Sequence, residues 1–404
     1  MIFRHPFLQH IRNFFNKKFV FLDLTPEETT LYKGLAILMI IMHNFFHWLP
    51  PGIGENEQNF HISRVENYLK ALGDPAYILQ ATFSFLGHYG VQVFLFLSAY
   101  GLTKKYAAAN IRYLSYLKRR IIKIYPPFLF SILIWLVYIA LAYGGIPTAV
   151  KTLLSNLDSL LYKLTFVANF IPRELYSVNG PWWFVSLIVQ FYVIFPYMLS
   201  MFKKYGTLFL LFFSLGSLLL TDYLQPYVDF PLAGTILPHI PELSIGIFFA
   251  SQKEVSLRYG AIVLIAIIFI LSNFDAFFWY FSFSSILILI LILFQILVVK
   301  SNIAVKNMIF FIGSISMYIF YINGFMRQPW IQSAKHYNTW YGNILICMLF
   351  ILIVIAVSFV MHRTERGVKY ALLGEKRYEK AVSVMTVLTI AVSILMLDPL
   401  HFWS

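Results

Sequence analysis

Apolar runs of about 20 residues, the length needed to cross a bilayer, follow one another along almost the whole of this 404-residue chain. Hydrophobic residues make up 59% of it and charged residues only 12%, a composition that excludes an ordinary soluble globular protein. The sequence therefore predicts an all-α, polytopic transmembrane helical bundle with about ten or eleven spans. The expected spans are 31–49, 78–100, 124–143, 182–200, 206–222, 236–252, 259–274, 277–299, 308–326, 340–361 and 381–399.

Lys and Arg are concentrated in the loops that would share one side of this bundle, which predicts a cytoplasmic N-terminus. An integral protein of the inner or plasma membrane, surrounded by membrane lipids, is expected. Residues 1–30 are expected to form a cytoplasmic interfacial segment, and residues 381–404 an extra C-terminal span. The net charge of +13 comes from short clusters between apolar runs, so it indicates topology and no nucleic-acid partner. The single cysteine, Cys347, excludes an intrachain disulfide and a cysteine-based metal site.

One histidine, His43, lies deep within a predicted span. A charge at the centre of a span costs on the order of 2.5 kcal/mol or more, so an ionisable residue there is rarely kept without a role. Because neutral imidazole can accept a proton from a hydroxyl, we predict that His43 is a general base. His47 and His88 lie toward the same membrane face, where they either pack or complete a histidine site. No acidic partner accompanies His43 and His47, so we expect no metal.

A cationic cluster lies at the mouth of the third predicted span. Arg119, Arg120 and Lys123 follow one another at helical spacing before Pro126 and Pro127. Forked guanidinium groups at such a place suit a pyrophosphate or nucleotide phosphate. The alternative is that these side chains mark a cytoplasmic loop or bind anionic lipid.

Several stretches together resemble the integral-membrane acyltransferase family three, in the order expected for that family. The first carries Lys33, Gly34 and His43, and the third carries an Arg-x-x-Arg motif as Arg120 and Lys123. The matching stretches are YKGLAILMIIMHNF (Tyr32 to Phe45), GVQVFLFLSAYGL (Gly90 to Leu102), YLKRRIIKIYPPF (Tyr116 to Phe128), WWFVSLIVQFYVIFP (Trp182 to Pro196), PELSIGIFFA (Pro241 to Ala250) and GSISMYIFYINGF (Gly313 to Phe325).

This resemblance implies an acyltransferase transmembrane domain over residues 31–380. It implies acyl-CoA, with acetyl-CoA as the expected form, as a co-substrate at the cytoplasmic face, and no metal. The acceptor would be a hydroxyl of a surface polysaccharide or a lipid-linked sugar on the outer face. His43 would be the catalytic base, and the CoA phosphates would be held by Arg119, Arg120 and Lys123. Candidates for the lining of the site are Lys33, Ser98, Trp183, Ser186, Gln190, Tyr192 and Glu242, of which Glu242, near His239, is also a candidate second acid or base.

The chain departs from the family pattern at three places. Ile188 and Val189 stand where many members carry an acidic pair, and Lys123 replaces an arginine, keeping the charge but losing bidentate geometry. Asn323 stands where a late histidine is usual, so we assign no catalytic role there.

Two other functions remain open from the residues alone. In a transporter or flippase of a lipid-linked saccharide, the intramembrane histidine and the cationic cluster would handle a phosphate-bearing substrate, and internal repeats or broken helices would be typical. A membrane polymerase of sugar chains would be favoured by a large outer loop, whereas the expected outer loops here are short.

Overall fold

The computed structural model describes residues 13–50, 52 and 58–368. Within them the chain is almost entirely helical, as the sequence predicted, and the helices have very different lengths. In chain order they are α2 (Pro26–Phe46), α3 (Ile62–Ala71), α4 (Ile78–Leu86), α5 (Gly90–Tyr106), α6 (Tyr113–Tyr143), α7 (Gly145–Ser155), α8 (Leu157–Leu164), α9 (Trp183–Tyr205), α10 (Thr207–Leu224), α11 (Ile240–Ser251), α12 (Tyr259–Ser272), α13 (Trp279–Lys300), α14 (Ile303–Ser314), α15 (Ser316–Met326), α16 (Gln328–Tyr337) and α17 (Trp340–Val368).

Seven helical segments of the described chain are long and apolar enough to cross a membrane, and the count reaches eight when a bent pair is taken as one span. An integral membrane protein is therefore supported, but the predicted count of ten or eleven spans is not confirmed. Two expected spans are short helices in the structure, α11 with 12 residues and α12 with 14. The expected span at 381–399 lies outside the described residues.

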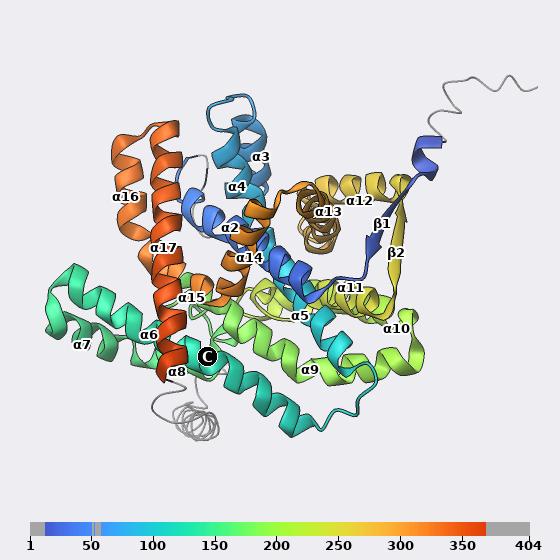
Figure 1. Ribbon diagram of the computed structural model, residues 1–404, viewed down its shortest axis with the longest axis horizontal. Coiled ribbons are helices and arrows are strands. Elements are labelled where there is room, and N and C mark those ends of the chain that lie inside the picture. The colour runs from blue at the N-terminus through green and yellow to red at the C-terminus, as the bar shows by residue number, and fades with distance from the viewer. Residues whose placement is uncertain (1–12, 51, 53–57, 369–404) are drawn as a thin grey trace, which may run out of the picture.

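Helix α2 occupies the middle of the bundle, between α5 and the bent pair α14–α15 (Figure 1). Its crossing with α14 is close because two glycines meet there. A Cβ added at Gly34 would overlap the carbonyl oxygen of Ile309, and one added at Gly313 would overlap the carbonyl oxygen of Thr30. Helices α14 and α15 meet at an angle of 73°, so α15 continues past α2 in a different direction.

The sequence did not reveal a small sheet that ties the segment before α2 to the body. Strand β1 (Lys18–Leu22) pairs antiparallel with β2 (Glu254–Arg258), with Val20 opposite Ser256. Part of the segment expected to be interfacial is therefore a strand. In Figure 1 both strands lie on the flank near α12, away from α16 and α17.

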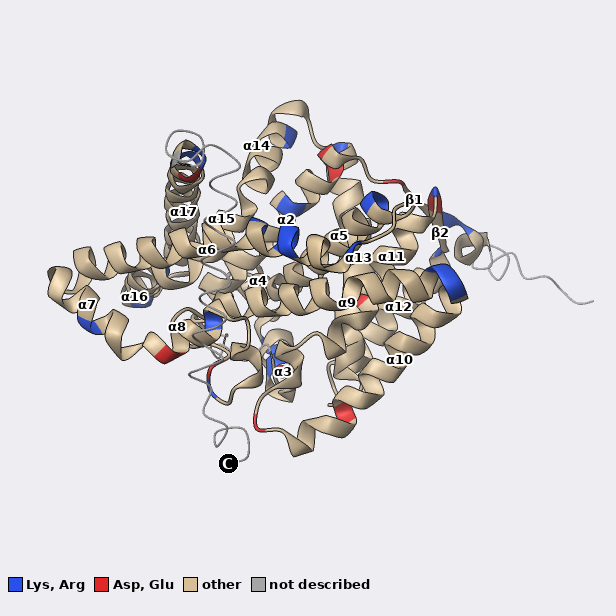
Figure 2. Cartoon of the chain, turned by 90° about the horizontal axis from the view of Figure 1, so that it is seen from below, with Lys and Arg blue, Asp and Glu red and all other residues tan. Residues whose placement is uncertain are grey.

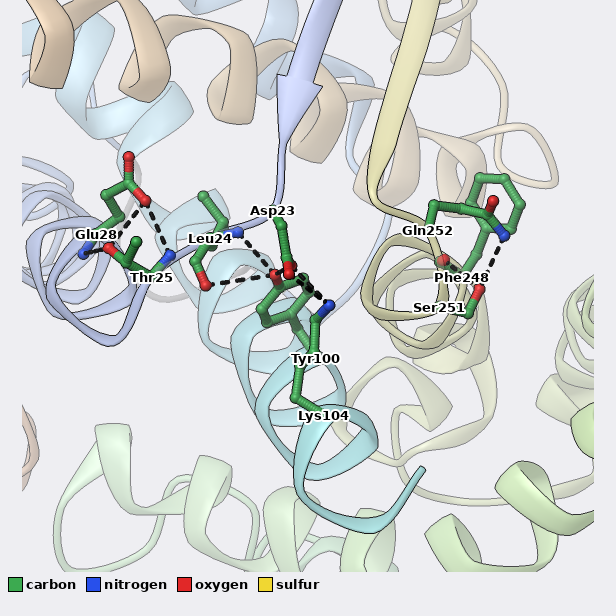
Figure 3. Close-up of polar contacts among 9 residues, drawn as sticks. All are labelled: Asp23, Leu24, Thr25, Glu28, Tyr100, Lys104, Phe248, Ser251 and Gln252. Carbon is green, nitrogen blue, oxygen red and sulfur yellow. Dashed lines mark hydrogen bonds and ion pairs between the residues drawn. The ribbon is translucent and has the colours of Figure 1, made fainter. Parts of the chain in front are cut away.

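A polar cluster fixes the turn between β1 and α2 (Figure 3). The hydroxyl of Tyr100 on α5 donates to Asp23 and accepts from the backbone N–H of Leu24 at 2.7 Å. Lys104 donates to the same carboxylate at 2.8 Å. Directly after Leu24, Thr25 and Glu28 form a reciprocal capping box that begins α2. This cluster sets the position of α2 relative to α5.

Lys and Arg lie around α2, α14 and the two strands, and fewer lie near α7, α8 and α16 (Figure 2). The part of the described bundle around α2 and α14 is therefore more basic than the part around α7, α8 and α16.

Candidate active site

A small cavity, here called the histidine cavity, lies at the C-terminal end of α2 and has a volume of about 50 Å³. Three buried histidines from different parts of the chain line it. His43 comes from α2, His88 from the 3₁₀ turn between α4 and α5, and His239 from the 3₁₀ turn before α11. Its lining is Ile40, His43, Asn44, Gln58, His88, Val91, Gln92, Tyr176, Gly180, Pro181, Trp183, His239, Phe283 and Phe320.

His43 is held in one orientation by the backbone of α4. Its Nδ1 lies 3.0 Å from the carbonyl oxygen of Ser84, an atom that can only accept, so Nδ1 carries a proton. In the neutral ring the lone pair is then on Nε2. The backbone approaches closely because position 87 is glycine, where a Cβ would lie 2.7 Å from the Cβ of His43. The result is an oriented imidazole with its acceptor nitrogen defined, which is what a general base requires.

The other histidines surround His43 without forming a metal site. The ring of His47 lies 4.5 Å and that of His88 5.3 Å from the ring of His43, measured between centroids. In the part of the chain that the structure describes, no group of three or more His, Cys, Asp or Glu side chains is arranged to hold a metal ion. Of the two histidines for which the sequence left packing and a histidine site open, His88 lines the same cavity as His43.

His239 forms a buried pair with Glu242. Its Nε2 lies 3.0 Å from the carbonyl oxygen of Ala233, and its Nδ1 lies 3.3 Å from Oε2 of Glu242. The ring stacks on Phe283 at 5.1 Å between centroids. Glu242 is fully buried and, among the described residues, stands behind His239 instead of lining the cavity. The prediction of Glu242 as a second acid or base remains a prediction, and its observed contact is with a cavity histidine.

A second and larger cavity, here called the cationic cavity, has a volume of about 280 Å³. Lys33 of α2 and Lys123 of α6 are the cations that line it in the described chain. The rest of its lining is Phe94, Ser98, Ile124, Phe184, Val185, Ile188, Tyr192, Gly313, Ser314, Ser316, Met317, Tyr318, Phe320 and Tyr321. Ser98 and Tyr192, both predicted as lining residues, are brought together here.

Two arginines predicted beside Lys123 lie near this cavity and outside its lining. The guanidinium of Arg120 lies 5.7 Å from the ring centroid of Tyr116 and 5.9 Å from that of Tyr192, within the range of a cation–π contact. Tyr192 lines the cavity and contacts Arg120, so Arg120 is separated from the cavity by one side chain. Arg119 is exposed on the same helix.

The predicted residues of α9 divide between two faces. Trp183 lines the histidine cavity and Tyr192 the cationic cavity. Ser186 and Gln190, four residues apart, line neither of these two cavities. Ser186 is fully buried, and Oε1 of Gln190 accepts from the backbone N–H of Ile236 at 2.9 Å. Ser186 is therefore an interior packing residue, and Gln190 holds the chain at the start of the 3₁₀ turn that carries His239.

The two cavities lie in series along the same four helices. Helix α2 contributes Lys33 to one and His43 to the other, ten residues later, which corresponds to ~15 Å along the helix axis. Helices α5, α9 and α15 also contribute residues to both cavities. Phe320 is the residue, among those described, that lines both. The two cavities therefore adjoin at Phe320, one at the Lys33 end of α2 and the other at the His43 end.

Asn323, for which no catalytic role was assigned, supports this arrangement from behind. Its Oδ1 accepts from Nδ2 of Asn44 at 2.5 Å, and its own Nδ2 donates to the carbonyls of Ile319 and Phe320. Asn44 follows His43 in the chain and lines the histidine cavity. Sequence reasoning also missed Gln92, whose Oε1 is buried without a hydrogen-bond partner among the described residues. The presence of a side-chain amide within an apolar span is the sequence signal that could have identified Asn44, Asn323 and Gln92.

Comparison with known families agrees with these observations. A family model described as an acyltransferase domain, that of acyltransferase family three, matches residues 29–363. No match was found among curated proteins or among solved structures. The matched range contains every residue of both cavities, and it spans most of the chain. The chain therefore belongs to the integral-membrane acyltransferase family three.

Proposed function

We propose that this membrane acyltransferase moves an acyl group, acetyl in the simplest case, from cytoplasmic acyl-CoA to a hydroxyl of a surface polysaccharide or a lipid-linked sugar. The observation that carries the proposal is the serial arrangement of a cationic cavity and a histidine cavity on the same four helices. A donor that bears phosphates at one end and a thioester at the other matches this order of charge and then base. The orientation proposed here places the Lys33 end of α2 in the cytoplasm, since Lys33 shares a cavity with Lys123 of the basic N-terminal part of α6.

The donor phosphates would be bound at the basic end. Lys33 and Lys123 line the cationic cavity, and Arg119 and Arg120 lie on the same helix as Lys123, four and three residues before it. Charge-assisted hydrogen bonds from these groups to phosphate oxygens are among the strong ones. The arm of the donor would then run along α2 and present its thioester to His43.

At His43 the reaction is a direct transfer. Nε2 takes the proton of the acceptor hydroxyl as its oxygen attacks the thioester carbonyl carbon, giving a tetrahedral oxyanion. The carbon–sulfur bond then breaks, and the departing thiolate receives the proton from His43, so the imidazole returns to its neutral form. The amide of Gln92 lines the same cavity and is a candidate donor to the oxyanion.

A covalent intermediate on Ser98 is less well supported. Ser98 lines the cationic cavity, and the described lining of that cavity contains no histidine and no carboxylate that would activate its hydroxyl. The imidazoles are in the other cavity. Direct transfer needs only groups that the histidine cavity already contains, so Ser98→Ala should retain turnover.

One observation favours the alternative of a transporter or flippase. Helices α14 and α15 form a span that is bent by 73°, and broken helices of this kind line substrate sites in many transporters. Here, however, the bent pair contributes Gly313, Ser316 and Phe320 to the cationic cavity, where a donor arm would also need them. The two functions differ in whether acyl-CoA is consumed.

The test is acetyl-CoA turnover by reconstituted protein, followed by release of free CoA thiol, with acetyl-CoA binding measured in parallel. His43→Ala should keep binding and lose turnover by at least about 100-fold, the lower end of what general acid–base catalysis contributes. Lys33→Ala combined with Lys123→Ala should lose binding. Lys300→Ala, at the end of α13 and outside both cavities, is the matched control and should change neither. Absence of acetyl-CoA binding in the wild-type protein would refute the proposal and favour transport.

A further inference from the structure

The two cavities are separated by aromatic side chains. Phe320 of α15 lies between them and lines both. The ring of Phe184 on α9 lies 5.2 Å from the ring of Phe320, and the ring of Phe94 on α5 lies 6.4 Å from that of Phe184, measured between centroids. Phe94, Phe184 and Phe320, here called the aromatic partition, thus come from three of the four helices that line both cavities.

The position of the aromatic partition matters because the two sides differ in size. The cationic cavity has a volume of about 280 Å³ and the histidine cavity about 50 Å³. A group of the size of a water molecule needs ~15 Å³ of cavity volume, so the histidine cavity holds about three or four groups of this size. An acetyl group has this size. A six-carbon acyl group does not fit in the same space.

The remaining walls of the histidine cavity do not offer more room. His43 is fixed by Ser84, and His239 is fixed by Ala233 and Glu242 while its ring stacks on Phe283. The partition, in contrast, is made of rings that contact one another through edges and tilted faces and have open volume on their other side. Removal of ring atoms from the partition is therefore the change that would extend the histidine cavity toward the cationic one.

We propose that Phe320 and Phe184 determine the length of the acyl group that this protein transfers, by closing the histidine cavity behind a short acyl group. This inference rests on the proposed function. The acyl end of the donor passes the partition from the cationic side and enters the histidine cavity, so a longer acyl chain needs room that the rings of Phe320 and Phe184 now occupy. A leucine at either position leaves an apolar wall but opens space between the two cavities.

The inference is tested with acetyl-CoA and hexanoyl-CoA as donors, purified protein in proteoliposomes, and a mixture of common monosaccharides as acceptors. The readout is the ratio of hexanoyl-CoA to acetyl-CoA turnover, measured as thiol release. Wild-type protein should strongly prefer acetyl-CoA. Phe320→Leu and, independently, Phe184→Leu should raise the ratio by about tenfold or more, which is the discrimination that a hydrophobic pocket obtains from one methylene group.

Phe325→Leu is the matched control. Phe325 lies on α15 with Phe320, its side chain is 8% exposed against 7% for Phe320, and it packs on Tyr138 outside both cavities. This variant should leave the ratio unchanged, and size-exclusion profiles of all three variants establish that they fold. If either Phe320→Leu or Phe184→Leu fails to fold, the turnover ratio of the other variant tests the inference.

Each remaining outcome is decisive. An unchanged ratio in folded Phe320→Leu and Phe184→Leu, an equal rise in Phe325→Leu, or a wild-type protein that uses hexanoyl-CoA as well as acetyl-CoA would overturn the inference while leaving the proposed function intact. Absence of turnover and of binding with either donor in the wild-type protein would overturn both.

Discussion

The hydrogen bond between Asn44 and Asn323 offers a quantitative test of how the site is built. Asn323 is fully buried and Asn44 is 8% exposed, so neither amide exchanges its partner for water. Replacing Asn323 by leucine, a side chain of similar size, leaves Nδ2 of Asn44 as a buried donor. An unsatisfied buried donor costs about 1–3 kcal/mol. The two bonds that Asn323 donates to backbone carbonyls are lost as well.

The coupling between the two amides is smaller than the cost of either single change. Interhelical hydrogen bonds in membrane proteins contribute about 0.6 kcal/mol on average and about 1.7 kcal/mol at most, because the unfolded chain in the membrane also finds partners. The deep burial of both amides places this pair in the upper half of that range. We therefore expect Asn44→Leu and Asn323→Leu to be non-additive by about 1 kcal/mol.

The assay is a double-mutant cycle of unfolding in mixed micelles with increasing SDS. The control cycle combines Asn44→Leu with Asn343→Leu, because Asn343 is also buried but donates to Gln80. This control should be additive. A coupling energy between Asn44 and Asn323 below about 0.5 kcal/mol, the usual scatter of additive pairs, would show that the hydrogen bond does not hold α2 to α15.

Two further predictions concern the elements that position α2. Burial acts to raise the pKa of Asp23, but the hydrogen bonds from Lys104 and Tyr100 and the charge of Lys104 outweigh it, so the pKa of this carboxyl is below its ordinary value. The stability that these contacts contribute is then present above the unfolded-state pKa of about 3.9 and is lost as the pH falls through the lower folded value. The acid-induced drop in unfolding midpoint below about pH 4 should therefore be smaller in Asp23→Asn than in the wild-type protein. An identical acid profile in the two proteins would contradict this assignment. Gly313→Ala should lower the yield of monodisperse protein, because the added Cβ overlaps the backbone of α2. The control Gly216→Ala in α10 should not lower it, because nothing lies within 4 Å of a Cβ added there. Size-exclusion chromatography in detergent measures both yields, and equal yields would show that α2 and α14 can separate without cost.

The length and apolar character of the helices could be predicted from the sequence, but their ends and breaks could not. The expected span at 308–326 is divided by a 73° bend between α14 and α15, which an uninterrupted apolar run does not reveal. Strand β2 alternates polar and apolar residues from Glu254 to Arg258, which is a period-two signal, yet its partner β1 lies more than 200 residues away. A single-sequence pattern does not show such a pairing.

For the candidate site, too, single residues could be predicted from the sequence, but their grouping in space could not. The depth of His43 in an apolar run was enough to single it out, and the basic cluster drew attention to Lys123. The sequence could not show that Lys33 shares a cavity with Lys123, since they are on different helices, α2 and α6. Nor could it separate Tyr192 from Gln190, two residues apart on α9, because which side faces the cationic cavity depends on how α9 packs.

Helix α2 fixes the distance between the cationic cavity and the histidine cavity. Lys33 and His43 are on one continuous helix without an internal proline, so the distance between them, ~15 Å along the axis, is set by the helix itself. Both ends of this helix are held, by the capping box and by the contact of Asn44 with Asn323. Under the proposed function, binding energy from the donor phosphates would place the thioester at a fixed depth, which is the kind of positioning that lowers the barrier to a bimolecular reaction. The aromatic partition, contributed by other helices, can change without altering that distance. Substitutions in the partition should therefore change which acyl group is used, while substitutions that shift α2 should reduce transfer from every donor.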